Sequence, residues 1–306
     1  MNDSNNMVCD LATGICGAAD EESIQAVDLN EAEKKVTLYY ATDPICSHCW
    51  ALEPVLNRLI REYGQYFEVK VLMGGLLAGW QGFSDGGNGI QKPADVAGHW
   101  REVGEHSRMP IDGSLWHTHP IQSSYPPSRV YKVIQSRHKG REAEFLRRAR
   151  EAVFAFNQNI AEEEVLVKLV DSIGLYGRQI VEEAGSEAAQ ELLEQDFAMT
   201  ARLGVRGFPT IIMVNEENKG VKLTGARSLE EYKQGLQQIV AQELKARKLP
   251  VLSNLLNDEP VLFAKELEVM YGIDKDAVQA FIEAELPAGS YRLQSVMGEM
   301  YVTAHR

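Results

Sequence analysis

The feature that most restricts the possible folds of this chain is a pair of cysteines two residues apart, Cys46 and Cys49. The apolar, β-branched stretch 36–40 precedes the pair and is typical of a buried strand, whereas residues 51–60 follow it with apolar side chains at helical spacing. The first N–H groups of a helix have no partner within it, and the helix dipole is positive there. We therefore expect a stabilised thiolate at Cys46, with Cys49 one turn further on and within bridging reach.

Zinc sites also use this cysteine spacing, but they need further ligands. No second C-x-x-C and no Cys/His pair of zinc-finger spacing follows in the sequence. His117 and His119 lie in proline-rich, loop-like sequence without a carboxylate arranged as a third ligand, which indicates ordinary loop histidines. A thiolate is the attacking species in disulfide exchange. We interpret Cys46 as the attacking sulfur and Cys49 as the resolving one, and we expect neither a metal nor a cofactor.

The stretch 46–50, C-S-H-C-W, with Glu53 seven positions after the first cysteine, resembles the DsbA family of the thioredoxin superfamily. That family carries proline where this chain has Ser47. The resemblance implies that His48 helps to stabilise the thiolate and that Ser47 and Trp50 contact substrate. It also implies that Glu53 tunes the resolving thiol, although an ordinary charge on a helix face is the alternative for this residue.

A second signature lies in residues 204–214, where G-F-P-T precedes an apolar strand. Proline has no N–H to donate to a strand ladder. The stretch resembles the thioredoxin superfamily, in which this proline is cis and faces the two cysteines. The resemblance implies that Pro209 shapes substrate docking and that Phe208 and Thr210 contact the substrate. A strand edge exposed at this point would let a substrate segment pair with the backbone.

The order of the predicted elements is strand–helix–strand over 36–72, helices over 128–203, and strand–strand–helix over 211–244. Ser228 is the expected N-cap of the last of these helices, which is expected to end at Leu244. A helical block inserted into such a core is the DsbA arrangement. We therefore predict an α/β, thioredoxin-like fold with a helical insertion and a small α+β extension at the C-terminus. The expected parts are a cysteine-bearing flexible tail (1–30), a DsbA-like thioredoxin domain (31–248) and a helix-turn-helix-plus-hairpin module (249–306).

The other two cysteines, Cys9 and Cys16, lie in a polar, turn-rich segment of the predicted tail. One interpretation is an auxiliary redox dithiol that exchanges with the pair at 46 and 49. A second is a metal site, and a third is a flexible tail with incidental thiols. The first interpretation is the one that we predict, and the other two stay open.

Charge and hydropathy exclude some classes of function. The 306-residue chain has a formal net charge of −13 and a pI of about 5.1, so it lacks the basic surface that nucleic-acid binding needs. The sequence contains no run of about 18 apolar residues, which is the length that a membrane span needs. The acidic N-terminal stretch has no basic region followed by an apolar one, as a secretory signal would have. We expect a cytoplasmic protein that binds neither nucleic acid nor membrane.

The last part of the chain outlines two helices, over 261–271 and 274–283, around a tight turn, followed by a hairpin over 291–303. Such an outline occurs in winged DNA-binding modules. Residues 251–306 contain nine acidic and four basic residues, however, which disfavours contact with phosphate. The composition therefore predicts a module that contacts protein.

Two branches of the resemblance imply different functions. The loops at 73–76 and 123–126 resemble the FrnE-like branch of the DsbA family, in which they line the substrate face, and the glycine-rich stretch 74–95 is expected to be a loop over that face. This branch implies an oxidoreductase or isomerase acting on protein or small-molecule disulfides. The stretch 43–54 and the whole layout also resemble the adaptor family that delivers the regulator Spx to the ClpXP protease. We predict the oxidoreductase, with the adaptor, which binds a regulator and a protease, as the alternative.

Overall fold

The structure is a computed structural model that describes residues 8–10, 15–17, 36–83 and 85–305. The chain divides into two units, Met1–Glu33 and Lys34–Arg306. In the first unit, β1 (Val8–Asp10) and β2 (Ile15–Gly17) pair antiparallel, with Cys9 opposite Cys16 in the backbone register. The side chains of this pair and the rest of the predicted tail (1–30) lie outside the described residues.

The second unit is organised around a four-stranded sheet with the order β4-β3-β5-β6. β3 (Val36–Thr42) runs parallel to β4 (Phe67–Met73), and α1 (Ser47–Tyr63) connects them as predicted. β5 (Thr210–Asn215) pairs antiparallel with β3 and with β6 (Gly220–Thr224). Because Ala41 lies opposite Thr210, the last residues of β3 and the first residues of β5 lie side by side at the same end of the sheet.

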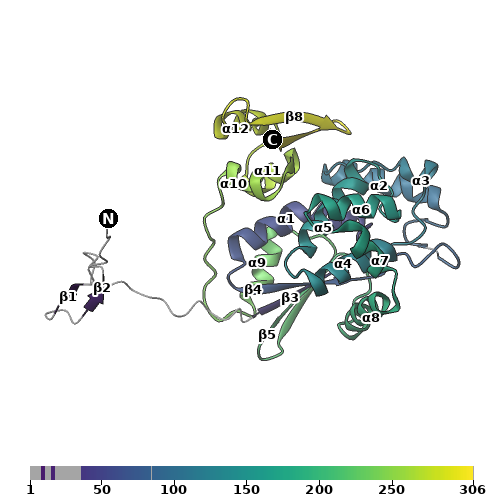
Figure 1. Ribbon diagram of the computed structural model, residues 1–306, viewed down its shortest axis with the longest axis horizontal. Helices are drawn as coiled ribbons and strands as arrows, with labels where there is room; N and C mark the ends of the chain where they lie inside the picture. The colour runs from purple at the N-terminus through teal and green to yellow at the C-terminus, as the bar shows by residue number, and fades with distance from the viewer. Residues whose placement is uncertain (1–7, 11–14, 18–35, 84, 306) are drawn as a thin grey trace, which may run out of the picture. The chain divides into compact units, whose positions relative to one another are not determined.

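The helices α1 and α9 (Leu229–Gln237) pack on one face of this sheet (Figure 1). Ser228 and Glu231 form a capping box at the start of α9, and Ser228 is the cap that the sequence predicts. The helix ends seven residues before the predicted end at Leu244. The side chain of Gln237 replaces the missing helical partners, since its amide group bonds to the backbone of residues 240, 242 and 244.

The helical insertion contacts the sheet through α8, which packs against β4 (Figure 1). It contains α4 (Tyr125–Arg137), α5 (Glu142–Arg150), the π-helix η1 (Glu151–Ala155), α6 (Glu163–Ser172), α7 (Gly177–Ala184) and α8 (Glu187–Arg202). Two further helices, α2 (Pro93–Ser107) and α3 (Leu115–Thr118), precede the predicted block. α2 buries Val96, Trp100 and Val103, whose spacing places them on one helix face.

The C-terminal module has its own apolar core and a three-stranded antiparallel sheet of order β7-β9-β8. Its elements are α10 (Leu252–Asp258), β7 (Val261–Phe263), α11 (Ala264–Tyr271), the 3-10 turn η2 (Lys275–Ala277), α12 (Val278–Glu285), β8 (Tyr291–Val296) and β9 (Glu299–Ala304). The prediction of one helix over 261–271 is wrong at its beginning. Leu262 pairs with Val302 in the sheet, and the helix starts only where Glu266 accepts the N–H of Phe263.

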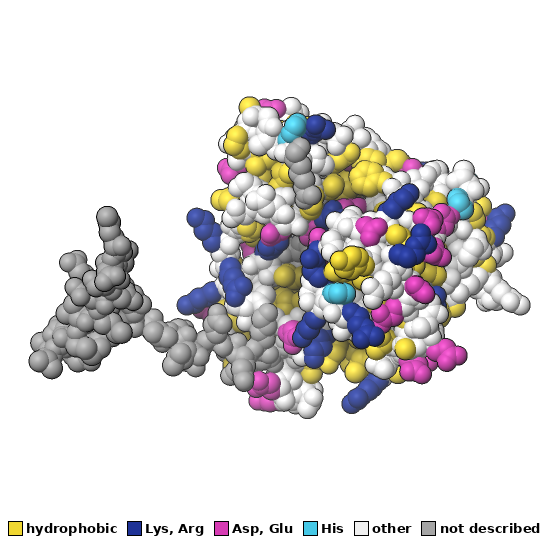
Figure 2. All heavy atoms as spheres, in the orientation of Figure 1, with side chains coloured by type: hydrophobic (Ala, Val, Ile, Leu, Met, Phe, Trp, Pro, Cys, Tyr) yellow, Lys and Arg dark blue, Asp and Glu magenta, His cyan; other side chains and the backbone are white. Residues whose placement is uncertain are grey.

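Figure 2 shows the surface of the face seen in Figure 1. Cationic and anionic side chains both occur across this face, with hydrophobic side chains between them. In the part of the chain that the structure describes, no helix combines the length and the apolar character that crossing a bilayer requires.

Candidate functional site

Cys46 follows the turn after β3 and is the N-cap residue of α1, in agreement with the prediction of a cysteine at the helix start. Its Sγ accepts a hydrogen bond from the backbone N–H of Cys49 at 3.3 Å, so the sulfur lies over the first turn of the helix. Both cysteines are free thiols, and Cys49 is completely buried. Cys46 lines an open hollow, so a reagent in this hollow meets Cys46 first.

The turn that holds Cys46 is fixed by the buried carboxylate of Asp43. Its Oδ1 accepts the N–H of Ile45 at 3.1 Å, and its Oδ2 accepts the N–H of Leu76 at 2.8 Å and the hydroxyl of Ser124 at 2.9 Å. Burial outweighs these bonds and raises the pKa of the carboxyl group to about 6. Asp43 thereby ties the cysteine turn to two loops that border it.

Arg150, at the end of α5, places a buried positive charge beside Cys49. Its Nη1 donates to Glu53 Oε1 at 2.7 Å, and its Nη2 donates to the hydroxyl of Thr42 and to the carbonyl oxygen of Asp43. The guanidinium carbon lies 5.9 Å from the centroid of the Tyr40 ring. A cation held at such a place favours the ionised form of a neighbouring thiol.

The two thiols share a hydrogen bond and therefore lose their protons as a pair. Burial opposes the ionisation of Cys49, but the hydrogen bond with Cys46, the charge of Arg150 and the hydroxyl of Thr42 outweigh it and lower the pKa of this thiol. Burial raises the pKa of Cys46, followed by the hydrogen bond with Cys49 and by repulsion within the pair. The sequence predicts the thiolate at Cys46, whereas the buried cation favours it at Cys49. We expect one negative charge that the two sulfurs share.

His48 lies between the cysteines with an exposed side chain, and its ring meets that of His99 edge-on at 5.2 Å between centroids. Partial burial, followed by the nearby rings of His99 and His106, lowers the pKa of His48. The neutral imidazole is therefore favoured at neutral pH. The predicted support for the thiolate would come from a hydrogen bond of this ring rather than from its charge.

A hollow of about 750 Å³ opens beside Cys46. Aromatic side chains form much of its wall, namely Trp80, Phe83, Trp100, Trp116 and Phe208. Several of these rings meet edge to face with centroids 5.2–5.9 Å apart, which holds the wall in place. The glycine-rich stretch 74–95 supplies part of this wall. Such a lining suits an apolar side chain of a partner.

The predicted substrate-contacting residues fall into two groups. Ser47 and Phe208 line the hollow, and the bond between Phe208 and Pro209 is cis, as the sequence predicts. Trp50 and Thr210 are buried, and each donates a hydrogen bond to a backbone carbonyl oxygen. The structure therefore places Trp50 and Thr210 in the core, where they support the site from below.

Gly74 determines where the ring of Phe208 can lie. A Cβ atom at Gly74 would lie 2.0 Å from this ring, so Gly74→Ala should push the ring toward the hollow. We expect a loss of stability of about 1 kcal/mol, because the ring can rotate, and roughly fivefold weaker binding of the apolar dye anilinonaphthalene sulfonate. Fluorescence titration and urea unfolding measure both. Gly98→Ala is the control, since no atom apart from its chain neighbours and the backbone of its own helix lies within 4 Å of its Cβ position. Equal dye binding in the two variants would contradict the prediction.

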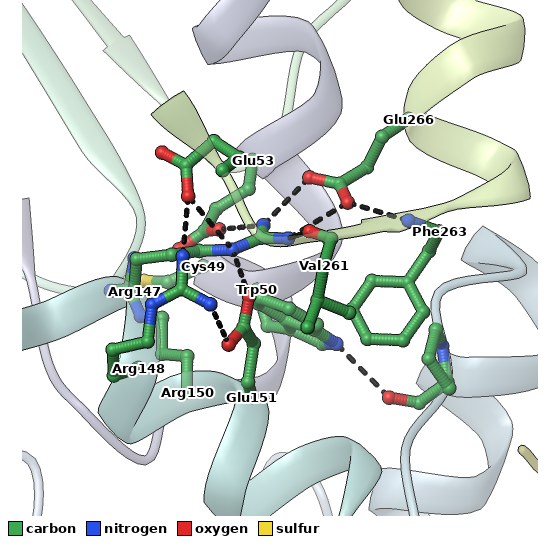
Figure 3. Close-up of polar contacts among 12 residues, drawn as sticks. Cys49, Trp50, Glu53, Arg147, Arg148, Arg150, Glu151, Val261, Phe263 and Glu266 are labelled. Atoms are coloured by element: carbon green, nitrogen blue, oxygen red, sulfur yellow. Dashed lines mark hydrogen bonds and ion pairs between the residues drawn. The ribbon is translucent and has the colours of Figure 1, made fainter. Parts of the chain in front are cut away.

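Glu53, the predicted tuning residue, bridges two buried arginines (Figure 3). Its Oε1 accepts Arg150 Nη1 at 2.7 Å, and its Oε2 accepts Arg147 Nη1 at 2.8 Å. Arg147 also binds Glu266 of the C-terminal module. The residue therefore connects the surroundings of the thiols to the module.

Sequence reasoning does not identify Arg150 and Asp43 as parts of this site. Arg150 lies four residues after Leu146 and four before Phe154, both buried, so it occupies the apolar stripe of its helix. A charge at such a position has to be paired, and this could have indicated its burial. Asp43 follows a buried strand directly, which is a weaker signal.

His117, His119, Cys46 and Cys49 are the candidate metal ligands within the described residues. Among the described residues, no group of three or more His, Cys, Asp or Glu side chains is placed to hold an ion. The Nε2 of His119 lies 2.6 Å from Oε1 of Glu162 at the surface, and His117 is exposed. Exchange between Cys9 or Cys16 and the buried pair stays a prediction.

Comparisons with known proteins extend over most of the chain. A family model described as "Thioredoxin" matches residues 39–234. The ClpXP adapter protein SpxH of Halalkalibacterium halodurans is 29% identical over 277 residues, which cover 90% of this chain and 90% of that protein.

Two solved structures resemble the same part of the chain. A putative protein disulfide isomerase from Nitrosomonas europaea has a TM-score of 0.57 at 22% identity and covers 67% of this chain and 97% of its own. The cytosolic disulfide reductase DsbM from Pseudomonas aeruginosa has a TM-score of 0.51 at 22% identity, covering 61% of this chain and 88% of its own. At these identities the likeness concerns the fold alone, and the predicted fold class is confirmed.

Proposed function

Because the chain belongs to the thioredoxin family, we propose that it uses this fold as a docking platform and is a cytoplasmic adaptor that brings a regulator to a ClpXP-type protease. The main support for this proposal is the length of the alignment with the adapter protein SpxH. The aligned 277 residues are too many to leave out the C-terminal module, whereas the family model ends at residue 234. Thiol-disulfide exchange accounts for the core but does not by itself require the module.

Two separate hollows support a protein with two partners. The first is the aromatic hollow beside Cys46. The second, of about 510 Å³, lies between α1 and the C-terminal module, with an apolar lining that includes Ile60 and Leu255 and with Arg61 and Arg247 among its polar side chains. An adaptor needs two binding surfaces that can be occupied at once. We assign the regulator to the aromatic hollow and the protease to the module side.

Thiol-disulfide exchange is the second candidate function, and the position of Cys46 at the start of α1 favours it. Cys46 as thiolate would attack one sulfur of a protein or small-molecule disulfide and release the other as a thiolate. Cys49 would then attack the Cys46 sulfur of the mixed disulfide and release the second substrate thiolate. The substrate gains two electrons, and the protein pair becomes a disulfide. Arg150 would stabilise the negative charge during both steps.

The double variant Cys46→Ser/Cys49→Ser separates the two functions. If the protein is an adaptor, degradation of the regulator Spx by reconstituted ClpXP should be accelerated by the wild type and, within about twofold, by this variant, because docking needs the hollow rather than the sulfurs. The matched variant Phe208→Ala should lose about tenfold in affinity for the regulator. Loss of all stimulation without the sulfurs, together with rapid insulin reduction by the wild type, would contradict the adaptor and support the oxidoreductase.

A further inference from the structure

We propose that the C-terminal module sets how readily the dithiol is oxidised. A series of buried side chains of alternating charge joins the module to the thiols, in the order Glu266, Arg147, Glu53 and Arg150 (Figure 3). We call these four residues the relay. This inference concerns the thiol pair itself, so it holds whether the protein acts as an adaptor or as an oxidoreductase.

The outer end of the relay holds the start of α11. Arg147 grips Glu266 with two parallel hydrogen bonds, from Nη1 to Oε1 at 2.6 Å and from Nη2 to Oε2 at 2.8 Å. Its Nη2 also donates to the carbonyl oxygen of Val261 at 3.1 Å, and Glu266 accepts the N–H of Phe263. Any movement of α11 against α5 therefore changes the surroundings of Arg147.

Arg147 has no spare hydrogen bond with which to absorb such a change. All five of its N–H groups are used, since Nε donates to Glu151 at 2.7 Å and the remaining donor reaches Glu53. The guanidinium carbon also lies 5.0 Å from the centroid of the Trp50 ring. If Glu266 leaves, Arg147 can compensate by binding Glu53 or Glu151 more closely, or Glu259, whose Oε2 lies 3.9 Å from its Nε.

The inner end of the relay, Arg150, lies next to Cys49. Glu53 divides its charge between Arg147 and Arg150, one carboxylate oxygen for each. The exposed fractions along the relay are small: Glu266 4%, Arg147 5%, Glu53 7% and Arg150 1%. Water screens such buried charges weakly, so removing the charge at one end of the relay changes the electrostatic potential beyond the neighbouring side chain.

The sign of the coupling follows from the order of the charges. Without the charge of Glu266, Arg147 attracts the carboxylate of Glu53 more strongly. Glu53 then neutralises the charge of Arg150 less. More positive charge then remains beside the thiols, which stabilises their reduced, partly ionised form. Loosening the module should therefore make the dithiol harder to oxidise.

The equilibrium with glutathione measures this effect in the full-length protein. Glutathione disulfide takes two electrons and two protons from Cys46 and Cys49, which yields two glutathione molecules and the protein disulfide. Glu266→Gln keeps the size of the side chain and removes its charge. We expect the oxidation equilibrium constant to fall about tenfold, which is about 30 mV for this two-electron couple.

Glu268→Gln is the matched control on the same helix. Glu268 is also buried and binds the core through two bonds to Arg108, at 2.8 and 2.5 Å, but it lies outside the relay. We expect the equilibrium constant of this variant to change by less than about twofold, because sites that share no partner affect one another only weakly. Equal shifts in the two variants would show that general loosening is the cause, and no shift in Glu266→Gln would overturn the proposal directly.

Hydrogen exchange tests the reverse direction without any substitution that affects folding. By thermodynamic linkage, if the contact with the module changes the free energy of oxidising the thiols, then oxidation changes the free energy of that contact by the same amount. The amides of α11 in the wild type should therefore exchange at rates that differ by about threefold or more between the dithiol and disulfide forms. Identical rates in the two forms would overturn the proposal even if the Glu266 variant fails to fold.

Discussion

Replacing Arg147 with methionine is expected to lower the free energy of unfolding by about 3–5 kcal/mol. The guanidinium binds Glu53, Glu151 and Glu266, all of which are buried. Methionine fills much of the same volume but leaves these three carboxylates without their shared partner. The loss is large because a buried charge that cannot be solvated or paired is costly.

Urea unfolding at pH 7, followed by tryptophan fluorescence, measures this loss. Arg137→Met is the matched control, because Arg137 forms an exposed ion pair with Glu183 and should change stability by less than about 1 kcal/mol. Adding Glu266→Gln to Arg147→Met should restore part of the loss, since one uncompensated charge is removed. A loss of under about 1 kcal/mol for Arg147→Met would mean that the carboxylates find other partners.

The local parts of the site follow from the sequence because short segments determine them. A thiol at a helix start, as at Cys46, depends on the strand and the helix immediately around it. The cis bond before Pro209 is implied by a resemblance that rests on a few adjacent residues. The capping role of Ser228 is equally local, and the structure confirms it together with the position of Cys46 and the cis bond.

The electrostatic part of the site depends on contacts between distant segments, which periodicity does not reveal. Arg150 meets Glu53 across 97 residues, and Arg147 meets Glu266 across 119. The strand at Val261 has the same cause, because it exists only through pairing with the end of the chain. Apolar spacing shows that a helix has a buried face, but it does not show which charge lies beneath a thiol.

The burial of the dithiol bears on the choice between the two candidate functions. The adaptor requires a shaped hollow, and the sulfurs contribute only a small part of its wall. The oxidoreductase requires an accessible sulfur, and Cys46 is 5% exposed. A substrate disulfide therefore has to enter the aromatic hollow before it can react, which gives the hollow the same recognition role in both functions.

The stability of the protein is expected to depend on pH through Asp43. Its pKa is raised from 3.8 to about 6 in the folded protein, chiefly by burial. In the unfolded chain the group ionises near the lower value, so the folded state binds more protons between these two pH values. The contribution of Asp43 to stability is therefore fully present below about pH 4 and is lost as the pH rises through 6, for a total of about 3 kcal/mol.

The variant Asp43→Asn isolates this contribution, because asparagine does not titrate. Between pH 4.5 and 7.5 the stability of the variant relative to the wild type should rise by about 2 kcal/mol, measured by urea unfolding at each pH. Ser124→Ala removes a hydrogen bond that favours the ionised carboxylate, so it should move the midpoint of the wild-type pH dependence upward. A stability difference between Asp43→Asn and the wild type that stays constant across this range would show that Asp43 ionises alike in the folded and unfolded protein. The carboxylate would then hold the cysteine turn without any cost of burial.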